Sequence, residues 1–273
     1  MQSQPEHLCQ AARAVILESE PSAKVALTRL FAAAWQCGDI ASVGGTPLPD
    51  RPARPAAPEL RPPRDMPKRN PSGEAGRVAF LHAIAHIELN AIDLAWDIVG
   101  RFTAEDLPRA FYDDWVIVAK DEAEHFDLLS RRLVELGAAY GDLPAHDGLW
   151  EAATSTADDL LARLALVPMV LEARGLDTTP TAVRRLRDAG DAASADILET
   201  IGVEEIPHVA AGVRWFEYLC ARRSLEPVAT FRRLVDEHFR GTLKPPFNDD
   251  ARAEAGFSPN YYQPKADGET AKL

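Results

Sequence analysis

The chain has 273 residues, 46% of them hydrophobic and 26% charged, which is enough to bury a sizeable core in one large domain or two smaller ones. A formal net charge of −12 disfavours broad, non-specific binding to nucleic acid or to an anionic membrane, although a local basic patch stays open. The sequence shows neither a long apolar run nor a signal-peptide pattern, so we expect a cytoplasmic protein without a membrane partner. The three cysteines are far apart, which argues against a disulfide framework or a thiolate metal site.

Two N-terminal segments precede the main helical region. Residues 1–45 contain two short runs of helical spacing separated by Pro21, and we expect a helical hairpin there. Residues 46–73 hold nine of the 21 prolines, too many for a helix, so this segment is an extended strap or linker. Its basic residues outnumber its acids. It is either a solvated linker or a strap that pairs with acidic side chains of the following helices.

The rest of the chain predicts an all-α fold. Strand signals are nearly absent, and apolar residues recur at helical spacing in four long segments: 74–100, 109–138, 156–176 and 190–222. The connection between the second and third segments is long enough to run the length of a bundle. We therefore expect a four-helix bundle over 74–222 with a long crossover, and a C-terminal helix and tail over 223–273 packed on it.

The stretch DEAEHFDLL, residues 121–129, places ionisable groups inside an apolar pattern. On a 3.6-residue helix, Glu122 and His125 share a face with Trp115, Val118 and Leu129, so both groups should be buried. A buried carboxylate or imidazole without a partner costs several kcal/mol or is forced to neutralise. The pattern therefore predicts partners elsewhere in the fold.

A second motif of the same form supplies candidate partners. Glu205 and His208 repeat the E-x-x-H spacing on the apolar face of the fourth segment. The helix before each motif carries one inward carboxylate, Glu88 in the first segment and Glu172 in the third. The separations from each carboxylate to the next motif agree, since 122 − 88 = 34 and 205 − 172 = 33. The chain thus repeats a helix pair in which a Glu is followed by E-x-x-H.

Four carboxylates and two imidazoles converging in a bundle core would repel one another unless cations neutralised them. Two metal ions would neutralise this cluster. Oxygen and nitrogen ligands without thiolate suit iron, which we expect, or manganese as the alternative. Pro168 and Pro207 lie next to these ligands inside helices, where we expect a kink or bulge. Four further residues either support the metal ligands by hydrogen bonds or serve ordinary packing and solvation: His82, His86, Asp121 and Glu204.

Five stretches carry a resemblance to a known family: HIELNAIDLAWD, DEAEHF, LEARGLD, EEIPHV and GTLKPPFN. They resemble the ferritin-like domain-of-unknown-function family DUF455 over nearly the whole chain. The two E-x-x-H motifs are more distantly similar to di-iron tRNA hydroxylases and rubrerythrins. The resemblance implies a ferritin-like four-helix bundle and a dinuclear metal centre with the six ligands named above. It implies no reaction.

Three functions follow as hypotheses. The leading one is a di-iron oxidoreductase that uses dioxygen or peroxide to oxidise a small or nucleotide-derived substrate. The second is non-catalytic or structural metal binding. The third is tRNA modification, which the acidic balance opposes and the Arg-rich segment 46–73 favours. The oligomeric state is left open, with a homodimer as one alternative.

Overall fold

The computed structural model describes residues 5–71 and 73–263, and these are all-α, as predicted. The described residues contain no β-strand, only an isolated parallel bridge between Leu60 and Ala145. The chain divides into two compact units. Unit 1 comprises Met1–Trp150 with Asp188–Gly190, and unit 2 comprises Glu151–Arg187 with Asp191–Leu273. Each unit carries one of the two Glu and E-x-x-H helix pairs, and a single ferritin-like bundle stays a prediction.

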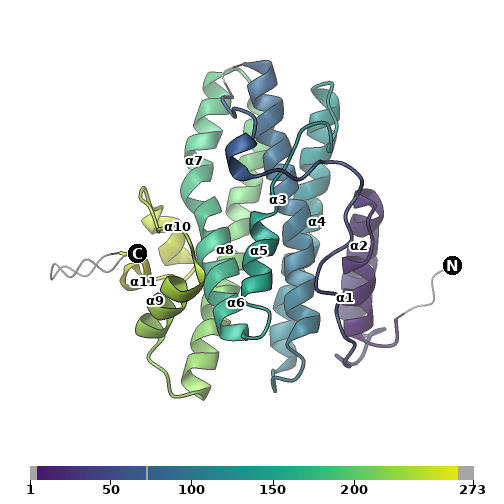
Figure 1. Cartoon of the computed structure of the whole chain (residues 1–273), viewed down its shortest axis with the longest axis vertical. Helices are drawn as coiled ribbons and strands as arrows, with labels where there is room; N and C mark the ends of the chain where they lie inside the picture. Colours follow the sequence, from purple (N-terminus) through teal and green to yellow (C-terminus); the bar gives the residue numbers. More distant parts are fainter. Residues whose placement is uncertain (1–4, 72, 264–273) are drawn as a thin grey trace. The chain divides into compact units, whose positions relative to one another are not determined.

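Unit 1 is built on a long helix pair. Helices α3 and α4 pack side by side, α1 packs on α3, and α2 packs on α4 (Figure 1). Glu20 caps α2 by accepting backbone hydrogen bonds at its N-terminus, and Pro21 occupies the first helical turn. The helical elements of this unit, with α5 continuing into unit 2, are α1 (Leu8–Ile16), α2 (Pro21–Cys37), η1 (Pro63–Asp65), α3 (Glu74–Arg101), α4 (Arg109–Glu135) and α5 (Gly148–Ser155).

The proline-rich segment is a strap rather than a solvated linker. Arg54 Nη1 lies 3.2 Å from Oδ2 of Asp93 on α3, and Arg51 pairs with Asp147. The Pro49 carbonyl accepts a 2.8 Å hydrogen bond from Arg101 Nη2. Two of the basic side chains of this segment, Arg51 and Arg54, thus attach it to acidic groups elsewhere in unit 1.

Helix α3 carries a buried polar stripe along one face. Four buried polar side chains recur there at helical spacing: His86, Asn90, Asp93 and Asp97. Asp93, fully buried, pairs with the equally buried Lys24 of α2. Asn90 accepts a hydrogen bond from Arg54 and donates one of 2.6 Å to the His86 carbonyl. Because Lys24 comes from α2 and Arg54 from the strap, this network ties α3 to two other segments of unit 1.

Helix α3 is also the candidate membrane span within the described part of the chain. An 18-residue window between Glu74 and Arg101 has a mean hydropathy of 1.3, but 72% of that window is buried inside the protein. Such burial is typical of the core helix of a soluble protein.

Unit 2 is built around α8 and an irregular helix that packs against it. Residues 160–188 form one helical run in which Val167–Glu172 adopt a π-helical turn, so Pro168 produces the expected bulge. No such interruption occurs at Pro207, where α8 continues as an α-helix. The elements of this unit are α6 (Leu160–Leu166), η2 (Val167–Glu172), α7 (Ala173–Asp188, its last residue assigned to unit 1), α8 (Ala192–Arg222), α9 (Pro227–His238), α10 (Asp249–Glu254) and α11 (Pro259–Tyr262).

The bounds of the third predicted segment differ from those of the observed helix at both ends. It begins at Leu160 rather than at residue 156, because Asp159 caps α6 through the amide of Leu161. It ends at Asp188 rather than at residue 176, because the helix continues through Pro180 and buries Leu186. Helical packing of this apolar face outweighs the cost of an internal proline. In the C-terminal part, α9 packs on α6 and α8, and the predicted tail residues 264–273 lie outside the described residues.

Candidate metal centre

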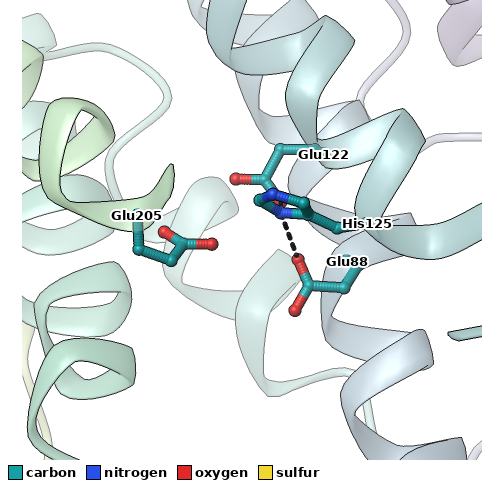
Figure 2. Close-up of side chains that lie close together, drawn as sticks. All are labelled: Glu88, Glu122, His125 and Glu205. Atoms are coloured by element: carbon teal, nitrogen blue, oxygen red, sulfur yellow. Dashed lines mark ion pairs between the residues drawn. The ribbon is translucent and has the colours of Figure 1, made fainter. Parts of the chain in front are cut away.

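Two adjacent helices of unit 1 bring together two carboxylates and an imidazole. Glu88 comes from α3, and Glu122 and His125 come from α4 (Figure 2). His125 Nδ1 lies 3.5 Å from Glu88 Oε2 and 3.5 Å from Glu122 Oε2. The i, i+3 spacing places Glu122 and His125 on one face of α4, and that face packs on α3. Three of the six residues predicted as ligands therefore lie together in unit 1.

Burial determines the electrostatics of these three groups. His125 is fully buried, Glu122 is 1% exposed and Glu88 is 4% exposed. Burial raises the pKa of Glu88 well above its ordinary value, and the charge of Glu122 raises it further. Burial acts to lower the pKa of His125, but hydrogen bonds to Glu122 and Glu88 and their charges together raise it. Both raised pKa values favour proton binding by the metal-free trio, and a bound cation would displace such protons.

The donor set and its spacing fit a metal ion. One ligand atom from each of Glu88, Glu122 and His125 lies within 4.8 Å of the other two. Donors about 2.1 Å from a common metal are roughly 3.0 to 4.2 Å apart, so small side-chain rotations would close the site. Two carboxylates and one imidazole suit iron or manganese, and a trio leaves coordination positions for further ligands. Unit 1 by itself contains a candidate metal site.

Unit 2 contains the corresponding motif on α8. Glu205, also drawn in Figure 2, is 5% exposed and His208 is 1% exposed. His208 Nδ1 lies 3.4 Å from Glu205 Oε2, close to the separation of the equivalent pair in unit 1. The same i, i+3 geometry produces both pairs. The apolar face predicted around them is buried throughout: Leu198, Ile201, Gly212, Trp215 and Leu219.

Glu172 differs from its counterpart Glu88. It is half-buried and is the last residue of the π-turn η2. Helix α8 packs closely on this turn, because a Cβ added at Gly212 would lie 2.5 Å from Cβ of Pro168. The missing side chain of Gly212 therefore permits the close approach of the two elements. The backbone that carries Glu172 is positioned by this contact with the helix that carries Glu205 and His208.

The expected neighbouring groups have other partners. His86 Nδ1 lies 2.8 Å from the Tyr140 hydroxyl, and its Nε2 lies 3.1 Å from the His146 carbonyl oxygen. Burial lowers the pKa of His86 to about 4, so its ring is neutral. His82 Nε2 accepts a 2.9 Å hydrogen bond from the Gly141 amide. Both histidines thus hold the connection that follows α4.

The acids that precede the two motifs lie nearer to solvent. Asp121 is half-buried, with Oδ1 3.7 Å from the Lys120 ammonium, and Glu204 is exposed. Such exposure is typical of solvated helix positions, and a supporting role for either acid stays a prediction.

Sequence analysis missed a fully buried ion pair of unit 1. Lys24 and Asp93 lie 69 positions apart, and both side chains are essentially inaccessible to solvent. The signal that could have found Asp93 was the polar spacing on α3, where it follows Asn90 by three positions. Nothing in the sequence around Lys24 marked it as buried. A further buried group is Trp115, whose indole N–H has no hydrogen-bond partner among the described residues.

These features define an all-α protein with a buried carboxylate and histidine cluster that could hold a metal ion. The family described as "Protein of unknown function (DUF455)" matches residues 17–263, so the chain belongs to the DUF455 family. An "Uncharacterized protein" of Haemophilus influenzae (strain ATCC 51907 / DSM 11121 / KW20 / Rd) is 44% identical over 211 residues, which span 76% of this chain and 73% of that protein. No solved structure matches this chain.

Proposed function

We propose that this protein binds two metal ions and acts as an oxidoreductase. The observation that carries the proposal is the buried trio of Glu88, Glu122 and His125, whose ligand atoms lie within 4.8 Å of one another. Unit 2 repeats the same residue types at the same helical spacing. The full ligand set that we propose, with iron first and manganese as the alternative metal, is Glu88, Glu122, His125, Glu172, Glu205 and His208.

When bound, the metals would supply redox chemistry with dioxygen or peroxide, and the oxidised substrate would be a small or nucleotide-derived molecule. The chain itself would hold the metals and control protons. The carboxylate of Glu122 and the imidazole of His125 would bind one metal from a single helix face, and the protons held by Glu88 and His125 would be released as the metal enters. The buried side chains of Val118 and Leu129, on the same face, would keep water from the ligands.

One alternative function is metal binding without catalysis. The buried trio supports it equally, because a coordinatively filled site would stabilise the fold without reacting. A further alternative is tRNA modification, for which the strap gives less support than the sequence alone suggested. The strap residues Arg51 and Arg54 are engaged by acidic groups of unit 1, and Arg61 pairs with Glu59. Fewer free cations remain there for phosphate contacts than the sequence suggested.

The proposed location is the cytoplasm. The burial of α3, the candidate membrane span among the described helices, supports a soluble protein, and the acidic balance gives no reason to expect a membrane surface.

Anaerobic loading with ferrous iron, followed by exposure to oxygen or hydrogen peroxide, tests catalysis against structure. An oxidoreductase should consume oxygen or peroxide and change its ultraviolet–visible spectrum over seconds to minutes, and Glu122→Ala/Glu205→Ala should abolish both responses. Tight iron binding that raises the melting temperature, with no consumption of either oxidant, would contradict the proposed activity and favour structural metal binding. Absence of iron and manganese binding would overturn both.

A further inference from the structure

A pocket in unit 2 lies outside the six proposed metal ligands. It has a volume of about 180 Å³ and is open on one side. Its walls come from the π-turn η2, from α7, from the loop that follows α9 and from α10. The apolar lining residues are Val170, Leu171, Phe239, Leu243 and Phe247, and the charged ones are Arg174, Asp177, Lys244 and Arg252.

One buried ion pair neutralises two of the charged groups. Arg252 donates hydrogen bonds to both oxygens of Asp177, at 2.9 and 2.8 Å, and both side chains are almost inaccessible to solvent. The aromatic ring of Phe247 lies 5.0 Å from the Arg252 guanidinium carbon. A pair with this bidentate geometry is satisfied internally and forms a fixed wall.

The other two charged groups are cations whose hydrogen-bond donors are not all used within the described residues. Arg174 uses Nη1 to donate hydrogen bonds to the carbonyls of Lys244 and Pro246, and the same nitrogen lies 3.4 Å from Asp177 Oδ2. Its Nε and Nη2 donate no hydrogen bond within the described residues. This edge of a guanidinium binds a carboxylate or phosphate in a bidentate manner, and Arg174 is already held by the loop. The ammonium of Lys244 has no ion-pair partner among the described residues.

We propose that this pocket binds a small organic oxyanion, a carboxylate or phosphate attached to an apolar body of about one ring. The charge argument is local, because two available cations face the pocket in a chain whose net charge is −12. The size argument follows from volume: a cavity of roughly 150 Å³ accommodates benzene, whereas drug-sized ligands need about 300 Å³ or more. The apolar walls would contact the ring while Arg174 and Lys244 bind the oxyanion.

The pocket adjoins the proposed metal ligand Glu172, since Val170 and Leu171 belong to the same π-turn. The pocket would therefore anchor the substrate, and this role rests on the proposed oxidoreductase activity. Binding of the oxyanion itself does not rest on it, because no metal ligand lines the pocket. The test is done on the metal-free protein for this reason.

Isothermal titration calorimetry of the full, chelator-treated chain should give saturable binding of benzoate or phenyl phosphate, with a Kd of roughly 0.1–1 mM. Neutral benzamide should bind at least about tenfold more weakly. Lys244→Gln and Arg174→Gln should each weaken binding of the anion by about tenfold, and Arg184→Gln, an exposed position on the same helix as Arg174, should leave it unchanged.

The Lys244→Gln variant separates loss of a contact to the anion from a change in the shape of the pocket. Arg174 also holds the loop, so its variant could act by loosening the pocket, whereas the Lys244 side chain makes no such hydrogen bond. Equal binding of benzamide and benzoate would overturn the proposal, as would wild-type affinity in Lys244→Gln. Absence of saturable binding by either anion up to about 10 mM would also overturn it and would leave the metal proposal untouched.

Discussion

The two units carry the same candidate ligand types, a Glu followed by E-x-x-H, on different backbones. In unit 1, Glu88 is 4% exposed on a regular 28-residue helix that a buried polar network holds in place. In unit 2, Glu172 is half-buried at the end of a six-residue π-turn. A regular, well-anchored helix presents its carboxylate in one position, whereas an irregular turn depends on what packs against it. We therefore expect unit 1 to bind metal more tightly than unit 2.

The largest expected effect comes from breaking the network that holds α3. Asp93→Asn removes the partner of buried Lys24 and should destabilise unit 1 by about 3–5 kcal/mol. Hydrogen exchange followed by mass spectrometry should show faster exchange in residues 5–150. The double variant Lys24→Met/Asp93→Leu, which removes both charges, should recover most of the loss. Equal exchange in wild type and Asp93→Asn would show that the network does not hold the helix.

The next effect concerns the trio itself. Glu122→Gln removes one carboxylate ligand and should weaken the tighter iron site by about 100-fold or more, measured by competition with a coloured chelator. Glu124→Gln is the matched control, because its carboxylate lies two positions away and pairs with Arg29 near the surface. Similar losses in both variants would mean that general acidity, rather than the buried trio, attracts the metal.

A substitution at Gly212 tests the contact between α8 and the π-turn of unit 2. An alanine Cβ would collide with the Pro168 ring, so Gly212→Ala should destabilise unit 2 by about 1–3 kcal/mol and weaken the second metal site more than the first. Gly175→Ala is the control, since a Cβ there meets nothing within 4 Å, and it should be neutral or stabilising. Denaturant unfolding and iron titration measure the two effects. Equal weakening of both metal sites would contradict the expected difference in metal affinity between unit 1 and unit 2.

The smallest effect is a pH dependence carried by His82. Burial lowers the pKa of this histidine below its ordinary value of 6.5, so the unfolded chain binds a proton more readily than the folded one. The stabilisation is present above pH 6.5 and is lost as the pH falls below that value. His82→Gln keeps an acceptor for the Gly141 amide but does not titrate. Its unfolding free energy should fall less than that of the wild type between pH 7 and 5, and parallel curves would refute the assignment.

Periodicity was sufficient to predict the regular parts of the site. The faces around Glu122 and Glu205 are visible in the sequence because each helix is long and its apolar positions follow a 3.6-residue period. The spacing of 34 and 33 residues linked each motif to its preceding carboxylate. Whether all six ligands share one centre stays a prediction.

The irregular and long-range features could not be predicted in the same way. Pro168 indicated a disturbance but not a π-turn, and the identical residue type at Pro207 left α8 unbroken. The outcome depends on the partner surface, here the bare backbone at Gly212. Burial of Lys24 depends on Asp93, 69 positions away, and no local pattern encodes such a contact.

The central claim is that both motif pairs bind one dinuclear centre, and metal content per chain tests it most directly. Inductively coupled plasma mass spectrometry of iron-loaded protein should give about two irons per chain for the wild type and for Glu124→Gln. Glu122→Gln and Glu205→Gln should each weaken iron binding at both positions, although not equally, because in a dinuclear centre each metal helps to neutralise the ligands of the other. If each variant loses one iron and keeps the other at wild-type affinity, the two units hold separate sites and the dinuclear centre is wrong.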